Sequence, residues 1–225
     1  MGLATAKILV SRDVDAKALA AAQKEFEGQD ADIMFTKVDI SKRIEVEGWI
    51  KSTIEHFGQL IGVANCAGIL GTENAFRPLS DLEDDAWDRI IGVNHTGTMY
   101  CLRAEIKNIV DGGSIVSISS VSGLEGMSNL TAYSASKHGV IRLTRAAAKE
   151  VGTRKIRVNT VAPGIIRTLL TLKKQDSNKT EFPPAGVLGR HGEAEKVASI
   201  LVWLLGPEST FVTGAVYTVD GGWHC

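Results

Sequence analysis

Tyr133 and Lys137 stand four residues apart in the segment AYSASKHG, so a helix would carry both side chains on one face. Ser120 ends the apolar segment SIVSISS, which has the character of a buried strand. Ligands of parallel sheets bind beyond the carboxyl ends of the strands. These residue types and their spacing therefore predict a hydroxyl, a phenol and an ammonium gathered at one edge of a sheet.

The chemistry that such a set could perform is proton transfer on an oxygen atom. A tyrosine pKa of about 10 is too high for a base at neutral pH, but a neighbouring ammonium favours the phenolate and lowers that pKa. Tyr133 would then be a general acid or base, and Ser120 would donate a hydrogen bond to a substrate oxygen on which charge develops. If a hydride moves at the adjacent carbon, a cofactor has to supply it.

The elements that must position these residues alternate along the chain. Short apolar, β-branched runs predict strands at 32–40, 60–68, 114–120, 156–164 and 215–222. Longer amphipathic patterns predict helices at 13–26, 42–57, 83–109, 131–152 and 193–205. Strands that are apolar on both faces and separated by helices indicate an α/β fold with a doubly wound parallel sheet. The long loop at 165–192 is expected to be a lid over a binding site.

Composition excludes several other classes of protein. A chain of 225 residues suits one domain, and 25 basic against 26 acidic residues leave no basic field for nucleic acid. Cys66, Cys101 and Cys225 lack CxxC spacing and the histidines lack HxxxH spacing, so neither a disulfide framework nor a metal site is expected. No apolar run approaches the ~20 residues of a membrane span, and no signal peptide is apparent. We therefore expect a cytoplasmic protein without a membrane or nucleic-acid partner.

The motifs follow one another in the order of a known family. Ser120 precedes Tyr133 by thirteen positions, NCAG stands at 65–68, and VNHTG contains Asn94. The segments NTVAPGIIRT and TGAVYTVDGG follow. Over essentially its whole length the chain resembles the short-chain dehydrogenase/reductases of the classical type, with a Rossmann-like fold. The motifs are jointly very specific.

This resemblance implies an NAD(P)-dependent oxidoreductase that interconverts an alcohol and a ketone. Tyr133 would be the acid/base, Lys137 would bind the ribose and lower the tyrosine pKa, and Ser120 would polarise the carbonyl. Asn94 would hold a helix backbone and a water of the proton relay. The implied cofactor contacts are Gly2, Asp39, Ile40, Asn65, Ala67, Gly68, Tyr133, Lys137, Pro163, Gly164, Ile166 and Thr168.

The opening of the family's pattern is interrupted in this sequence. In the family a strand and the motif Thr-Gly-x-x-x-Gly-x-Gly precede the first helix, and Gly2 resembles the last of those glycines. A second strand, whose end chooses between NAD and NADP, would stand between Arg12 and Asp13. The resemblance thus predicts a single domain over 1–225, with a truncated cofactor half at 1–68 and a catalytic half at 69–225. The sheet would be reduced from seven strands to about five.

Three resolutions of this gap are open. The sequence could represent an incomplete gene model, the strand at 32–40 could close up beside the strand at 60–68, or a partner subunit could fill the gap. A rearranged sheet would bind a dinucleotide poorly, because the glycine-rich turn supplies N–H groups to the pyrophosphate. Cofactor-independent acid/base chemistry, as in an isomerase, dehydratase or cyclase, and a catalytically silent oligomer subunit are therefore alternatives.

Two further expectations concern the surroundings of the site. The helices at 83–109 and 131–152 pair across a two-fold axis in the family, which implies a homodimer or homotetramer. The stretches 121–127 and 165–188 would line a partly apolar pocket for a small alcohol or ketone. Alternation of side chains along a strand also predicts that Ser119 faces away from Ser120.

Overall fold

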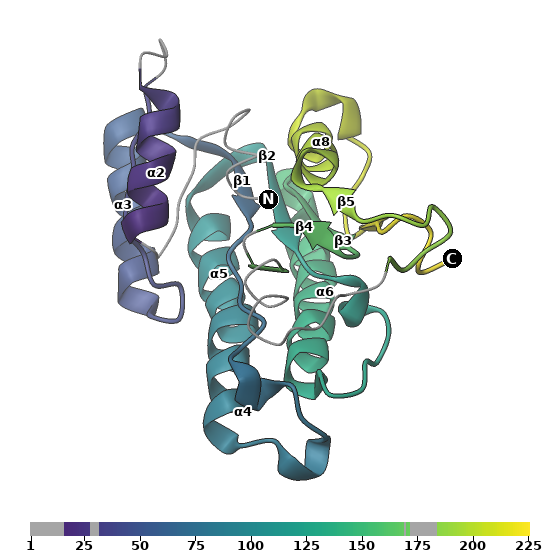
Figure 1. Ribbon diagram of the computed structural model, residues 1–225. Helices are drawn as coiled ribbons and strands as arrows, with labels where there is room; N and C mark the ends of the chain where they lie inside the picture. The colour runs from purple at the N-terminus through teal and green to yellow at the C-terminus, as the bar shows by residue number, and fades with distance from the viewer. Residues whose placement is uncertain (1–15, 28–31, 169, 172–183) are drawn as a thin grey trace.

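A computed structural model of the chain describes residues 16–27, 32–168, 170–171 and 184–225 (Figure 1). Within these residues a parallel sheet has the strand order β1-β2-β3-β6. Its strands are β1 (Leu60–Asn65), β2 (Ile109–Ile118), β3 (Arg157–Pro163) and β6 (Val216–Val219). A separate parallel pair consists of β4 (Ile166–Arg167) and β5 (Gly192–Glu193).

Helices cover both faces of the main sheet. Ile115 of β2 packs in a buried cluster with residues of α5 (Thr98–Asn108) and α6 (Thr131–Val151), whereas the next residue, Val116, packs against α8 (Ala194–Leu205). Because successive side chains of a strand point to opposite faces, α8 lies on the face opposite to α5 and α6. Figure 1 shows α5 and α6 running alongside each other. The predicted doubly wound parallel sheet is confirmed.

The remaining helices lie toward the start of the chain. α2 (Ala16–Phe26) precedes α3 (Arg43–Phe57), which packs on α5. The helical pattern at 83–109 is divided into α4 (Asp84–Ile91), a π-helical turn (Gly92–Gly97) and α5. In the described part of the chain, no helix is both long and apolar enough to cross a membrane.

The predicted strand at 32–40 is wrong. Lys37 makes one isolated bridge, and the segment is otherwise irregular until the turn that begins at Ile40. Two of its apolar side chains are nevertheless buried, because Val38 and Ile40 join the cluster that includes Trp49 of α3. The apolar run therefore reflects core packing without a strand ladder. Among the described residues the main sheet has four strands, and 32–40 does not close up beside β1 as a fifth.

Candidate active site

Ser120 and Tyr133 meet where β2 ends and α6 begins. Ser120 has an extended backbone and caps the short 3-10 turn Val121–Gly123, where its Oγ accepts a hydrogen bond from the backbone N–H of Ser122 at 3.2 Å. The Ser120 side chain is also close enough to the phenol of Tyr133, in the first turn of α6, to lower the pKa of that phenol. The end of β2 and the start of α6 thus bring the Ser120 hydroxyl and the Tyr133 phenol together.

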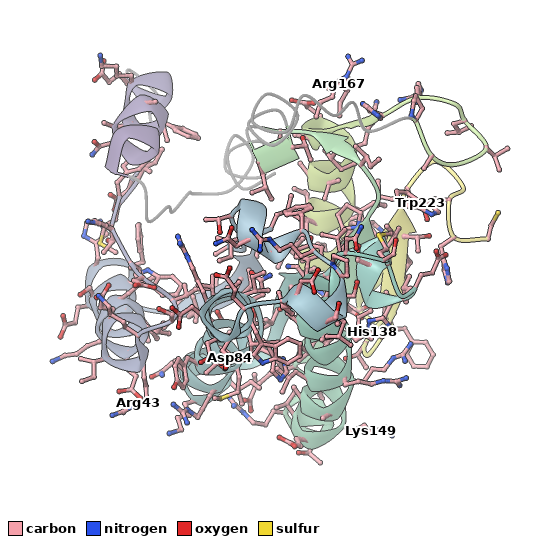
Figure 2. The ribbon with its side chains drawn as sticks, turned by 60° about the horizontal axis from the view of Figure 1, so that its bottom comes forward. Arg43, Asp84, His138, Lys149, Arg167 and Trp223 are labelled. Atoms are coloured by element: carbon pink, nitrogen blue, oxygen red, sulfur yellow. The ribbon has the colours of Figure 1, made fainter. Side chains whose placement is uncertain are left out.

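Lys137 lies one helical turn after Tyr133 and is buried. Its ammonium donates a hydrogen bond to the backbone carbonyl of Ile118 at 3.0 Å. Nζ lies 5.7 Å from the centre of the Tyr133 ring. The helix spacing therefore brings the ammonium and the phenol to the same end of β2. Figure 2 shows the surrounding side chains, with His138 and Lys149 marking the course of α6.

Burial dominates the electrostatics of this pair. It raises the pKa of Tyr133 to about 12, against the hydrogen bond from Ser120, which lowers that pKa. It lowers the pKa of Lys137 to about 8, against a charge interaction with Cys66. The two influences on the Tyr133 pKa are burial and Ser120, and burial is the larger, so the pKa lies above its ordinary value where a lowering by Lys137 was expected. At neutral pH the phenol therefore carries its proton.

Asn94 joins three separate segments through its buried side chain. Its Oδ1 accepts from the backbone N–H of Ile69 at 2.8 Å, and its Nδ2 donates to the Ile69 carbonyl at 2.8 Å. Nδ2 also donates to Oγ of Ser136 at 3.1 Å, and that hydroxyl donates to the Tyr133 carbonyl at 2.7 Å. The π-helical turn thereby ties the chain that follows β1 to the start of α6. The backbone that Asn94 holds is that of Ile69, in a loop, where a helix backbone was expected.

Gly68 provides the space in which this arrangement fits. A Cβ at this position would lie 3.2 Å from Nζ of Lys137 and 3.3 Å from Oδ1 of Asn94. Those distances are shorter than ordinary van der Waals contacts, so a side chain at Gly68 would displace the ammonium or the amide. Two of the other residues from the same motif differ in exposure: Asn65 is half-buried, whereas Ala67 is exposed.

Asn65 points toward the core. Its Nδ2 donates to Oε2 of the fully buried Glu105 at 2.9 Å and lies 3.5 Å from Oγ of Ser117. The sequence reasoning did not single out Glu105. A lone carboxylate among the buried positions of the 83–109 helical pattern was the signal that could have identified it.

Ile40 lies against the π-helical turn, whereas the carboxylate of Asp39 bonds to the neighbouring Ser41. A Cβ at Gly97 would lie 3.0 Å from Cγ1 and from the carbonyl oxygen of Ile40, so glycine permits close contact there. Oδ1 of Asp39 accepts from the backbone N–H and the hydroxyl of Ser41 at 3.0 and 2.7 Å. The hydrogen bond from the Ser41 hydroxyl is the main cause of a lowered pKa for Asp39.

The segment after β3 lies at the carboxyl ends of β3 and β6. The N–H of Gly164 donates to the Val219 carbonyl at 3.1 Å, and a Cβ at Gly164 would lie 3.0 Å from Cα of Asp220. The other predicted residues of this segment are Pro163, which ends β3, Ile166, which pairs with Gly192, and Thr168, whose N–H donates to Oγ1 of Thr171 at 3.0 Å. Gly2, and residues 169 and 172–183 of the predicted lid, lie outside the described residues.

The residues at the end of β2 fit the sugar and nicotinamide end of a dinucleotide. An ammonium has three N–H donors, and Ile118 supplies the one carbonyl bonded to Lys137 Nζ among the described residues. Lys137 can therefore donate to sugar hydroxyls as well. Gly68 keeps a side chain away from that ammonium. In the part of the chain that the structure describes, no group of three or more His, Cys, Asp or Glu residues could hold a metal ion.

Comparisons with known proteins agree with this architecture. The family model described as Enoyl-(Acyl carrier protein) reductase matches residues 4–224. The protein named Short-chain dehydrogenase/reductase ABA4 from Pyricularia oryzae is 51% identical over 235 residues, which cover 99% of this chain and 87% of that protein. The aligned stretch is longer than this chain of 225 residues, so the relative carries residues within it that this chain lacks.

Two solved structures extend the comparison. The crystal structure of levodione reductase superposes with a TM-score of 0.91 at 31% identity, covering 98% of this chain and 92% of that one. The structure of NAD+-bound xylitol dehydrogenase gives a TM-score of 0.87 at 26% identity, covering 98% and 94%. Both are similar to this chain over nearly its full length.

Proposed function

The chain belongs to the short-chain dehydrogenase/reductase family, and on that premise we propose that Ser120, Tyr133 and Lys137 form the proton relay of this enzyme. As a member of the family it is a nicotinamide-dependent oxidoreductase of alcohols and ketones. The observation that carries the relay is the interaction of Ser120 with the Tyr133 phenol, which lowers the pKa of that phenol, beside the buried ammonium of Lys137.

Each relay residue has a distinct task in this proposal. A nicotinamide dinucleotide, when bound, supplies or accepts the hydride. Ser120 donates a hydrogen bond to the substrate oxygen and stabilises the negative charge that develops on it. Tyr133 is a neutral phenol because burial raises its pKa to about 12, so it gives its proton to the oxygen of a ketone that is being reduced. Oxidation of an alcohol requires the phenolate first, and its rate is therefore expected to rise with pH.

The other proposed residues bind or orient. Lys137 donates to the sugar hydroxyls, and Asn94 holds the Ile69 backbone against α6. We propose that Asp39, Ile40, Asn65, Ala67 and Gly68 line the adenosine side of the cofactor and that Pro163, Gly164, Ile166 and Thr168 line the nicotinamide side. Gly2 is proposed to belong to the pyrophosphate turn.

Apolar side chains near the relay favour an apolar substrate. Val121 follows Ser120 directly, and the thioether of Met127 accepts a hydrogen bond from the Ser122 hydroxyl at 3.0 Å. Leu188, whose N–H donates to the Gly221 carbonyl at 2.9 Å, is largely exposed at the ends of β3 and β6. Val121 is buried, so the accessible Met127 and Leu188 are the side chains that support a partly apolar ketone over a polyol.

The test combines binding with turnover. The protein is titrated with NADH and with NADPH by fluorescence, and then assayed with levodione plus reduced cofactor and with xylitol plus oxidised cofactor. We expect saturable binding of at least one dinucleotide and faster turnover of levodione than of xylitol. Absence of saturable binding at millimolar concentrations would favour cofactor-independent acid/base chemistry. Binding without turnover of either substrate, or of a wider panel of ketones, would favour a catalytically silent subunit.

A further inference from the structure

Two successive residues at the end of β2 contact Lys137 at opposite ends of that residue. The carbonyl of Ile118 accepts from Nζ at 3.0 Å. The hydroxyl of Ser119 donates to the backbone carbonyl of Lys137 at 2.8 Å. Ser119 is 1% exposed, and it lies in the first position after the strand. Both the charged head and the backbone of Lys137 are therefore tied to the same point of the sheet.

Both the backbone and the hydroxyl of Ser119 have little freedom to move. Its backbone N–H donates to the Val161 carbonyl of β3 at 2.8 Å, which attaches the residue to the neighbouring strand. On the other side, a Cβ at Gly123 would lie 2.4 Å from Oγ of Ser119 and 2.8 Å from the carbonyl of Lys137. The 3-10 turn, the serine hydroxyl and the backbone of α6 are in contact without room for an added methyl group.

The hydrogen bond from Ser119 is not needed to complete the helix. The carbonyl of Lys137 lies in the interior of α6, where the ladder of helix hydrogen bonds already supplies it with an N–H partner. A carbonyl oxygen has two lone pairs, and the serine hydroxyl uses the second. The bond therefore fixes where α6 lies against β2.

We propose that Ser119 is a positioning residue for the relay, fixing the backbone of α6 at Lys137 and so the place of the ammonium relative to Tyr133. This inference rests on the proposed function of the relay. Strand alternation predicted only that the Ser119 side chain faces away from Ser120. It did not predict that this side chain contacts α6, the helix that carries Tyr133 and Lys137.

The chain offers a matched control for this proposal. Ser114, in the middle of β2, is 2% exposed, and its hydroxyl donates to the backbone carbonyl of Leu204 in α8 at 2.8 Å. Ser114→Ala, within β2, and Ser119→Ala, directly after it, each remove one buried hydrogen bond to a helix carbonyl. α8 carries no relay residue. We therefore expect similar losses of melting temperature from the two variants, and different effects on Lys137.

The first readout needs neither cofactor nor turnover. The ε-carbons of ¹³C-labelled lysine are titrated by NMR, and the Lys137 signal is assigned by its loss in Lys137→Met. The wild-type signal is expected to titrate near the pKa of about 8 that burial gives Lys137. In Ser119→Ala the helix relaxes and admits water, so that pKa rises by about half a unit or more toward its ordinary value. Tyr133 and Cys66, the titratable groups facing Lys137, are retained in both serine variants.

The second readout compares the effect of each substitution on kcat with its effect on the KM for the cofactor. Because a small misplacement of a relay group slows the chemical step, Ser119→Ala is expected to lower kcat about tenfold while the KM for the cofactor changes less than about threefold. Ser114→Ala should leave both constants within about twofold of the wild type. The proposal is overturned if the two variants behave alike in the titration and in kcat.

Two further outcomes have defined meanings. If the wild type turns over no substrate, the proposed function fails, while the lysine titration still decides whether Ser119 positions Lys137. If Ser119→Ala does not fold, Ser119→Cys, which keeps a weaker donor, is compared with Ser114→Cys in the same two measurements. An unmoved Lys137 titration in Ser119→Cys, with kcat equal to that of Ser114→Cys, would then overturn the proposal.

Discussion

In the proposed relay, the pKa values of Tyr133 and Lys137 differ from those that the sequence spacing of the two residues predicts. Spacing on a helix brings Tyr133 and Lys137 together, but burial then makes the phenol harder to ionise and the ammonium easier to deprotonate. Both effects come from loss of solvation, which depends on what α6, β2 and the 3-10 turn enclose. The resting site therefore holds a protonated phenol, which suits the proposed donation of a proton to a ketone.

Gly68→Ala tests how tightly the relay is packed. The new methyl group would lie 3.2 Å from Nζ of Lys137, and the lysine side chain would have to move by a few tenths of an ångström. We expect kcat to fall about tenfold, because the ammonium is displaced, with little change in melting temperature. Steady-state kinetics measures the change in kcat, and thermal denaturation measures the change in melting temperature.

The control for this substitution is Gly48→Ala. Gly48 lies on the exposed side of α3, and a Cβ there meets nothing within 4 Å. This variant should keep full activity and gain up to about 1 kcal/mol of stability from helix propensity. If Gly68→Ala were as active as Gly48→Ala, the close contact with Lys137 would have no part in the reaction.

The meeting of Ser120, Tyr133 and Lys137 was predictable from sequence, because two local rules produce it: helix spacing, and the position of a serine at a strand end. The contacts of Ser119 and Glu105 were not. Alternation gives the direction of Ser119 but not its partner, which lies 18 residues further along the chain. The contact of Glu105 could be predicted only if it were known that the side-chain amide of Asn65, 40 residues earlier, points into the core.

At the scale of elements, the π-helical turn shows what periodicity cannot resolve. The apolar pattern at 83–109 predicted one helix, and the structure inserts a wider turn at Gly92–Gly97 between α4 and α5. Such a turn adds a residue without interrupting the helical course, and it is common at functional sites. Here it carries Asn94, whose amide bonds both Ile69 and Ser136.

The segment 32–40 failed as a strand for a related reason. An apolar, β-branched run indicates that part of the segment is buried, and Val38 and Ile40 are buried against α3. They do not report whether a neighbouring strand supplies hydrogen bonds. The four strands of the main sheet, in contrast, were predictable, since runs that are apolar on both faces need helices on both sides.

Arg157 attaches the end of α8 to β3, and its replacement should destabilise the fold without affecting the chemistry. Its guanidinium donates to the carbonyls of Leu204 and Gly206 at 2.7 and 3.0 Å and to Oγ of Ser209 at 2.8 Å. Arg157→Met leaves these acceptors without that donor. We expect a loss of about 2–4 kcal/mol in the free energy of unfolding, with kcat of the folded enzyme unchanged.

Chemical denaturation measures this effect. The matched control is Arg43→Met, which breaks an exposed pair with Glu47 on α3 and should cost no more than about 0.5 kcal/mol. Equal losses from the two variants would show that Arg157 does not hold the end of α8.

At the scale of the molecule, the layered fold follows from the sheet being covered on both faces. β1 lies at one side of the sheet, and among the described residues it pairs with β2 alone. Ile61 of β1 is 58% exposed, unlike the buried residues of β3. The part of the family pattern that the sequence interrupts includes the turn that binds the pyrophosphate, so dinucleotide binding is the property of the whole molecule most in need of measurement.

Assembly of the molecule is a second prediction at this scale. The helices α4, α5 and α6 match those that pair across a two-fold axis in the family. We expect a homodimer or homotetramer, which size-exclusion chromatography with light scattering measures directly. A single species of 24.1 kDa, the mass of one chain, would contradict this.

The central claim is that Tyr133 transfers the proton, and Tyr133→Phe tests it most directly. This change removes the transferable proton and keeps the ring. Tyr217→Phe is the matched control, because Tyr217 stacks edge-on against Trp203 at 5.5 Å outside the relay. With saturating cofactor and ketone, we predict that Tyr133→Phe lowers kcat by about 10²–10⁴-fold while Tyr217→Phe stays near the wild type. Turnover of Tyr133→Phe equal to that of the wild type would contradict the account.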